Sequence, residues 1–282
     1  MSSESYVRVL LALAPLVVCL AFSLEDDWWT RPRAIGCLTA AVLFGCSVWG
    51  GGFGVWGALP WLFLTAGRAF SAARELAGVS WGQTADMARL AAFLFLPVGC
   101  VWALFDQLGY QPLGFSGIIV LLTGIHFHYA GFALPRLTGL WLQSEPRGPV
   151  FKWATWGVIA GVPLVAIGIT TSQLGLPDWV EVLCVSVLAA SALVVSLAQL
   201  EWAFRAPLPL LARLMFALGG LALASGMVLA VLYGWRSLFP MAWLSIPAMI
   251  ATHGTLNSLG FCLPGLVAWK VHLSERKKSQ NI

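Results

Sequence analysis

Long apolar segments follow one another along almost the whole chain, and they constrain the fold more than any other feature of the sequence. A helix needs about 20 mostly apolar residues to cross the hydrocarbon core of a bilayer. Only 10% of the 282 residues are charged, whereas a typical soluble domain carries roughly 25%. The sequence therefore predicts an all-α, polytopic bundle of about nine transmembrane helices. The expected helices cover residues 7–24, 33–49, 52–68, 88–106, 115–137, 152–172, 178–203, 208–234 and 240–271.

The connections between these segments are too short and too apolar to form a soluble domain. We therefore expect a single integral membrane domain over residues 1–282. Residues 69–87 mix charged and small apolar side chains, which favours a short interfacial helix on the cytoplasmic side. Residues 273–282 are expected to form a basic cytoplasmic tail.

The distribution of Lys and Arg predicts the orientation of the chain. If nine helices alternate in direction, 14 of the 16 basic residues fall on one side, and only Arg8 and Arg236 fall on the other. The positive-inside rule assigns the richer side to the cytoplasm. We therefore expect the N-terminus outside and the C-terminus in the cytoplasm. Because the basic residues are spread over many short loops, they do not indicate a nucleic-acid partner.

A short sequence pattern recurs in the fifth and ninth expected helices. Gly-Phe-Ala-Leu-Pro occupies residues 131–135, and Gly-Phe-Cys-Leu-Pro occupies residues 260–264, an offset of 129 residues. The same offset places the third helix on the seventh and the fourth on the eighth. This suggests one leading helix followed by two parallel repeats of four helices. The alternative is chance, because the chain is rich in these residue types.

Each copy of this pattern combines a glycine with a proline four residues later. Proline has no backbone N–H and clashes with the carbonyl four residues before it. Helix kinks are therefore expected at Gly131 with Pro135 and at Gly260 with Pro264.

Polar residues near the middle of the fifth and ninth helices form the candidate site. These are His126, His128, His253 and Asn257. Ionisable groups at this depth are unfavourable, usually face the bundle interior and often mark function. His126 and His128 are two residues apart, hence about 200° apart around a helix, so only one of them can face a common site. We expect His126 to be structural or to support the others.

Three interpretations fit these residues. The first is a transition-metal or haem site with His128 and His253 as ligands, in a membrane redox protein. The second is a proton or substrate site in a transporter of a small molecule or ion, with Asn257 fixing a histidine tautomer. The third is structural, with hydrogen bonds that hold two kinked helices together. Neither the G-x-S-x-G nor the H-E-x-x-H motif of classical hydrolases occurs, and the sequence leaves open whether the protein is an enzyme.

Two parts of the chain resemble a known family. The segment from Gly124 to Phe132, together with Thr252-His253-Gly254 and the later Asn257-x-x-Gly260-Phe261, resembles the YndJ-like family of bacterial membrane proteins. This resemblance implies a location in the bacterial cytoplasmic membrane, with the lipid bilayer as the partner. It implies no established activity, and it does not decide among the three interpretations.

Overall fold

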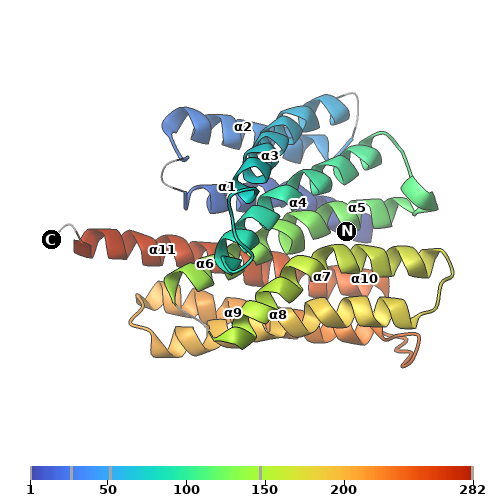
Figure 1. The fold of residues 1–282 in the computed structure, drawn as a ribbon. Coiled ribbons are helices and arrows are strands. Elements are labelled where there is room, and N and C mark those ends of the chain that lie inside the picture. Colours follow the sequence, from blue (N-terminus) through green and yellow to red (C-terminus); the bar gives the residue numbers. More distant parts are fainter. Residues whose placement is uncertain (1, 26–27, 51–52, 146–147, 281–282) are drawn as a thin grey trace. The chain divides into compact units, whose positions relative to one another are not determined.

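The described part of the chain is entirely helical. The structure is a computed structural model that describes residues 2–25, 28–50, 53–145 and 148–280, without the side chains of residues 279 and 280. Within these ranges no strand occurs, and nine long helical segments follow one another, some of them interrupted by π-helical turns labelled η (Figure 1). The elements are α1 (Ser3–Phe22), α2 (Arg31–Ser47), α3 (Gly54–Leu76), α4 (Thr84–Gln107), the short 3₁₀ turn η1 (Pro112–Gly114), α5 (Gly117–His126), η2 (Phe127–Ala133), α6 (Leu134–Ser144), α7 (Pro149–Gln173), α8 (Trp179–Arg205), α9 (Leu210–Gly234), α10 (Ile246–Met249), η3 (Ile250–Gly254), η4 (Leu256–Cys262) and α11 (Leu263–Gln280).

Several of these helices have the length and composition of membrane spans. Among the described residues, six qualify: α1, α4, the continuous Gly117–Ser144 segment, α7, α8 and α9. Of the others, α2 has 17 residues and α3 contains Pro60 and basic residues in its second half. The predicted all-α membrane fold with about nine helices is therefore confirmed.

Several helix ends differ from the sequence-based prediction; the fifth helix, for example, reaches Ser144 instead of residue 137. Residues 69–76 are the last turns of α3 instead of a separate helix, because no proline or glycine lies between Arg68 and Gly78. Residues 240–245 are not helical, since the Ser245 side chain caps the backbone N–H of Ala248 and sets the helix start at Ile246. The basic segment after residue 272 continues α11 as far as Gln280 instead of forming a separate tail, because it consists largely of good helix formers.

The chain divides into two compact units. The first comprises residues 1–147 with 173–175 and contains α1 to α6, and the second comprises 148–172 with 176–282 and contains α7 to α11. The single domain expected over the whole chain stays a prediction.

In the first unit, α4 contacts α3, α5, η2 and α6, while α1 contacts α2, α5 and η2. Three buried aromatic rings join these helices: Phe22 of α1, Phe93 of α4 and Phe132 of η2. The centroid of the Phe22 ring lies 5.8 Å from that of Phe93 and 5.7 Å from that of Phe132. At this distance aromatic rings attract one another in addition to burying apolar surface.

In the second unit, α9 contacts α8, η3, η4 and α11. Its aromatic core joins Trp202 of α8, Phe216 of α9 and Trp269 of α11, with ring centroids 5.2 to 5.5 Å apart. Helix α7 approaches α8 closely at Gly161, where an added Cβ would lie 2.8 Å from the Leu188 Cα. Both units are therefore built from tightly packed helices around a central one.

Within the fifth and ninth helices, the element boundaries repeat at the offset of 129 residues. Helix α5 begins at Gly117 and α10 begins at Ile246, 129 residues later. The π-helical segments η2 and η4 and the starts of α6 and α11 follow at the same offset. In the first unit η2 and α6 pack on α4, and in the second η4 and α11 pack on α9. The fifth and ninth helices therefore share one order of elements and one packing arrangement, and the leading helix followed by two sets of four stays a prediction.

The interruption expected at the two glycine–proline pairs takes the form of a π-helical segment. The backbone N–H of Leu134 donates to the carbonyl of Tyr129, and that of Leu263 donates to the carbonyl of Ser258. Each of these bonds spans five residues instead of four, immediately before a proline that has no N–H to donate. Single π-helical turns inside α-helices occur frequently at functional sites.

Candidate functional site

His128 lies in η2 and is buried in the first unit, 1% exposed. Its Nδ1 lies 2.8 Å from the Gly124 carbonyl oxygen, and its Nε2 lies 3.2 Å from Nε1 of Trp61 in α3. The indole N–H can only donate, so Nε2 must be the acceptor and Nδ1 must carry the proton that is donated to Gly124. His128 is therefore neutral, with both ring nitrogens occupied by partners from its own unit.

A glycine in α4 makes room for this histidine. An added Cβ at Gly99 would lie 2.6 Å from Nδ1 of His128 and 2.9 Å from the carbonyl oxygen of Gly124. The ring of Phe44 closes another side, with its centroid 5.6 Å from that of the imidazole. The site of His128 is thus a closed aromatic pocket between α2, α3, α4 and η2.

His126 has different surroundings. It is half-buried, and its ring lies edge-to-face with Phe127 at a centroid distance of 5.5 Å. It does not take part in the bonds from His128 to Trp61 and Gly124. This arrangement agrees with the expectation that the two histidines point to different sides.

His253 and Asn257 form a second site, in η3 and η4 of the second unit. His253 Nδ1 lies 2.8 Å from the carbonyl oxygen of Gly226 in α9, which assigns the proton to Nδ1. Asn257 Nδ2 donates to the His253 carbonyl oxygen at 2.8 Å; it also lies 3.2 Å from Nδ1, which in this tautomer has no lone pair to accept. Nε2 of His253 keeps its lone pair, and no described residue donates to it.

The two sites correspond to each other through the repeat. Asn257 follows His128 by 129 residues, and each side chain donates to the carbonyl oxygen four residues earlier. Each also faces a glycine of the neighbouring helix: an added Cβ at Gly226 would lie 2.7 Å from Nδ2 of Asn257, as the one at Gly99 would lie 2.6 Å from the His128 ring. His128 and Asn257 therefore occupy equivalent positions: each donates to a carbonyl of its own helix and faces a glycine of the neighbouring helix.

The other two glycines predicted from the sequence also form helix contacts. An added Cβ at Gly131 would lie 3.2 Å from the Cβ of Phe95 in α4, and one at Gly260 would lie 2.7 Å from the Cβ of Ala222 in α9. Pro135 falls at the start of α6, and Pro264 falls at the start of α11. The two glycines and the two prolines thus lie where the interrupted helices pack on α4 and α9.

Several residues of these sites were not predicted from the sequence. Trp61, Gly99 and Gly226 lie on other helices, and nothing in their own sequence neighbourhood distinguishes them from the many other Trp and Gly residues of the chain. The one signal in the sequence was the buried histidine, which needs hydrogen-bond partners and therefore implied that some exist on other elements.

The described residues do not favour a metal or haem site. Among them, no three His, Cys, Asp or Glu side chains are grouped so that they could hold a metal ion. His128 would have to give up Trp61 or Gly124 to bind a metal, whereas His253 offers Nε2. These two histidines belong to different units.

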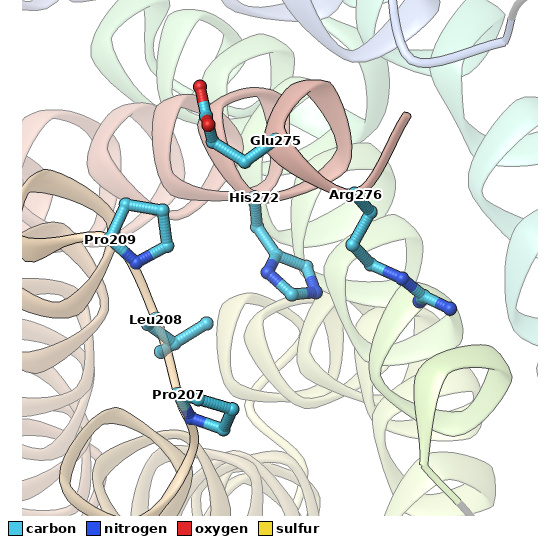
Figure 2. Close-up of a pocket in the computed structure, with 6 residues that line it drawn as sticks. All are labelled: Pro207, Leu208, Pro209, His272, Glu275 and Arg276. Atoms are coloured by element: carbon cyan, nitrogen blue, oxygen red, sulfur yellow. The ribbon is translucent and has the colours of Figure 1, made fainter. Parts of the chain in front are cut away.

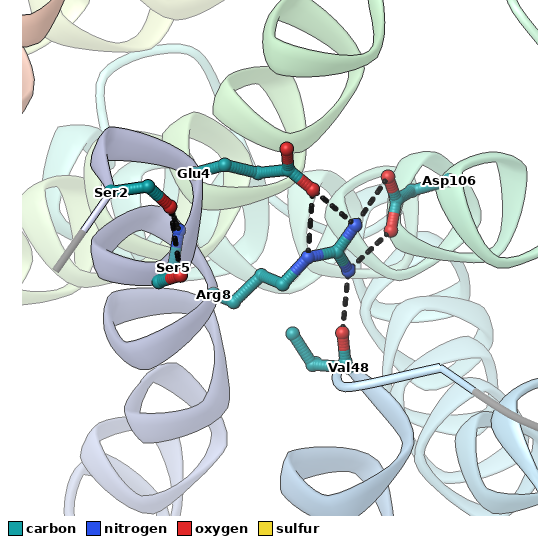
Figure 3. Close-up of polar contacts among 6 residues, drawn as sticks. All are labelled: Ser2, Glu4, Ser5, Arg8, Val48 and Asp106. Atoms are coloured by element: carbon teal, nitrogen blue, oxygen red, sulfur yellow. Dashed lines mark hydrogen bonds and ion pairs between the residues drawn. The ribbon is translucent and has the colours of Figure 1, made fainter.

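Ion pairs stabilise the ends of the helices that are predicted to face outward. Arg8 donates to Oδ2 of Asp106 at 2.8 Å and to the Val48 carbonyl at 2.6 Å, and it also pairs with Glu4 (Figure 3). In the second unit, Arg236 makes two bonds to Glu181, at 2.8 and 3.1 Å. Burial alone would lower the pKa of Arg236, but the hydrogen bonds and charge of Glu181 raise it.

A pocket lies at one end of the second unit, between the loop that joins α8 to α9 and the helix α11. It is lined by Pro207, Leu208, Pro209, His272, Glu275 and Arg276. His272 and Arg276 project from one side of α11, and Glu275 points the other way (Figure 2). Burial, followed by the charge of Arg276, lowers the pKa of His272, so its ring is neutral at neutral pH.

Comparison with known proteins assigns the family. The model of a family described as YndJ-like protein matches residues 9–261. The chain belongs to the YndJ-like family. This YndJ-like match includes the sites of His128, His253 and Asn257, and it confirms the resemblance found in the sequence.

One curated relative within this family is the "Uncharacterized membrane protein YndJ" of Bacillus subtilis (strain 168), 28% identical over 223 residues. The aligned part covers 78% of this chain but 38% of that protein, so the chain spans well under half the length of its relative. No solved structure matches the chain. The YndJ-like protein described here is thus a multi-pass membrane protein.

Proposed function

We propose that this protein is a transporter of a small polar solute or ion in the bacterial cytoplasmic membrane, and that His253 and Asn257 form its solute or proton site. The observation that carries this proposal is the Nε2 lone pair of His253. Nδ1 is held by the carbonyl of Gly226, so the ring has a fixed orientation, while Nε2 has no donor among the described residues. A fixed imidazole with one open nitrogen can accept a hydrogen bond or a proton from a solute.

The backbone around this site supports the proposal. His253 and Asn257 lie in η3 and η4, where the regular helical hydrogen-bond pattern is interrupted. Many transporters are built from internal repeats and place their solute sites at interrupted helices near the bilayer midplane. The 129-residue offset predicts an internal repeat of this kind, and the half-buried side chains of His253 and Asn257 lie on the interrupted helix of the second unit.

Transport is favoured over metal or haem binding by the state of His128. Both nitrogens of that ring are occupied, which removes one of the two histidines expected as ligands. A solute site needs neither a second histidine nor a carboxylate.

Reconstituted proteoliposomes test the proposal. Protein would be incorporated into vesicles that contain a pH-sensitive dye, and amino acids, sugars and monovalent and divalent cations would be added outside under an imposed potential. We expect at least one solute to cause a pH change or an uptake that His253→Ala and Asn257→Ala abolish. Thr252→Ala is the matched control, because Thr252 is exposed and its hydroxyl donates to the carbonyl of Ala248, four residues earlier in the same helical segment. If the folded wild-type protein moves no solute, or if His253→Ala leaves the flux unchanged, the proposal is wrong.

A further inference from the structure

A buried charged cluster lies in the first unit, away from the His128 pocket. It consists of Glu25 after α1, Arg68 of α3 and Arg136 of α6, whose side chains are 16%, 15% and 4% exposed. Arg68 makes a short ion pair with Glu25. Arg136 reaches Oε1 of Glu25 only at 3.6 Å, beyond hydrogen-bond distance.

The donors of this cluster are not satisfied. Nε and Nη1 of Arg136, Nε of Arg68 and Oε1 of Glu25 are buried and have no hydrogen-bond partner among the described residues, so the unpaired donors outnumber the one unpaired acceptor. Buried polar atoms in folded proteins almost always have partners, and an unpaired buried charge strongly destabilises a protein. The cluster therefore calls for a further acceptor that carries negative charge.

The charges near Arg136 also indicate that a negatively charged partner is needed. Arg89 of α4 is close enough to Arg136 to interact with it electrostatically, and its own partner is Glu75, at 2.6 Å. Three guanidinium groups are thus matched by two carboxylates among the described residues, and only Glu25 shares the buried space with Arg136. Asp26 and Asp27, the next residues in the sequence, lie outside the described residues.

Aromatic rings fix the geometry of the cluster. The guanidinium carbon of Arg68 lies 4.3 Å from the ring centroid of Phe93, 4.9 Å from that of Trp28 and 5.5 Å from that of Phe22. Stacking on aromatic faces holds a guanidinium plane in place and leaves its N–H groups at the edge available. Arg68 is therefore prearranged to donate to a group that Arg136 also reaches.

We propose that Arg136, Arg68 and Glu25 form a binding site for a phosphate group, supplied by an anionic lipid headgroup or by free inorganic phosphate. The several oxygens of one phosphate can accept from two guanidinium groups at once, and arginine is the residue best suited to such contacts. The cluster lies at the end of the first unit that the basic residues predict to face the cytoplasm, where both sources occur. Glu25 competes with the phosphate for the same donors and so limits its affinity. The site does not depend on the proposed transport.

Ligand-dependent thermal unfolding of the full-length protein in an uncharged detergent tests this inference. Inorganic phosphate would be titrated against chloride at equal ionic strength, and short-chain phosphatidylglycerol against phosphatidylcholine. We expect a saturable rise in unfolding temperature with phosphate, with phosphatidylglycerol or with both, which identifies the source. Arg136→Gln should weaken the affinity roughly tenfold, since it removes charge-assisted hydrogen bonds. Arg74→Gln is the control, because Arg74 is an exposed arginine on α3, the same helix as Arg68.

Glu25→Gln keeps the proposal testable even if Arg136→Gln does not fold. Removal of the competing carboxylate should tighten phosphate binding, whereas a merely structural role for the cluster would only lower the unfolding temperature. The proposal is overturned if the wild-type protein shows no saturable shift, if Arg136→Gln and Arg74→Gln change the affinity equally, or if Glu25→Gln weakens binding. Binding that arises only in the Asp26→Asn/Asp27→Asn variant would also overturn it, because an aspartate would then occupy the site.

Discussion

Trp61 determines the chemical state of His128. Its indole N–H can only donate, so Nε2 of His128 must remain an acceptor, and protonation of the imidazole would set two donors against each other. The bond from Nδ1 to the Gly124 carbonyl fixes the other nitrogen. A histidine held in this way supports the packing of η2 against α3 and α4, which is the structural interpretation for this residue.

Trp61→Phe should therefore destabilise the protein by about 1–3 kcal/mol, the usual effect of leaving a buried acceptor without its donor. The unfolding temperature in detergent is the measurement, and Trp56→Phe, at a site 70% exposed, is the control. In a His128→Ala background the same Trp61→Phe substitution should have a smaller effect, because no acceptor remains. Equal effects in both backgrounds would contradict the role of this hydrogen bond.

The sequence identified the polar residues of the two sites but not their partners. His128, His253 and Asn257 stand out because they interrupt apolar helices, whereas Trp61 is one of 15 tryptophans. The charged cluster escaped prediction for a different reason. In the sequence Arg68 and Arg136 are accounted for as basic residues near helix ends, and only the folded chain brings them to Glu25.

At the level of the helix, the main irregular elements are the π-helical segments η2 and η4. Hydropathy predicted the helices that contain η2 and η4, and the Gly–Pro pairs predicted where these helices are interrupted. Both signals lie in the local sequence. The π-helical form was not predicted, because the packing of η2 on α4 and of η4 on α9 is seen only in the folded chain. Glycines at these contacts allow that approach, as the distances at Gly99 and Gly226 show.

Gly99→Ala should lower the free energy of unfolding by about 1–3 kcal/mol, the usual range for overpacking a filled interior. The new methyl group would lie against the His128 ring and the Gly124 carbonyl. Gly36→Ala in α2 is a matched control, because no atom lies within 4 Å of the added Cβ. Denaturant or thermal unfolding of both variants in the same detergent is the measurement. Similar stability for the two would show that α4 and η2 are not closely packed at this point.

For the whole molecule, the distribution of basic residues predicts the orientation of the chain in the membrane. Arg8 and Arg236, the two basic residues on the predicted outer side, are each paired with buried or partly buried carboxylates, Asp106 and Glu181. These pairs stabilise each unit without leaving a free positive charge on that side. An outward N-terminus and a cytoplasmic C-terminus remain a prediction of the positive-inside rule.

Reporter fusions test this orientation. Alkaline phosphatase, which is active only outside the cytoplasm, should be active when fused after Gly109, between α4 and α5, and inactive when fused after Gly78, between α3 and α4. A green fluorescent protein fused to the C-terminus should fluoresce. Phosphatase activity at Gly78, or a dark C-terminal fusion, would reverse the predicted topology.

The two sets of four helices bear on the history of the chain. A set with an even number of crossings returns the chain to the face of the membrane from which it started. Such a set can be copied in tandem without turning the copy over, so that basic loops and interrupted helices keep their depth and their side. Histidine at position 128 and asparagine at position 257 would then be two descendants of one ancestral side chain, one now hydrogen-bonded to the indole of Trp61 and the other beside the half-buried imidazole of His253.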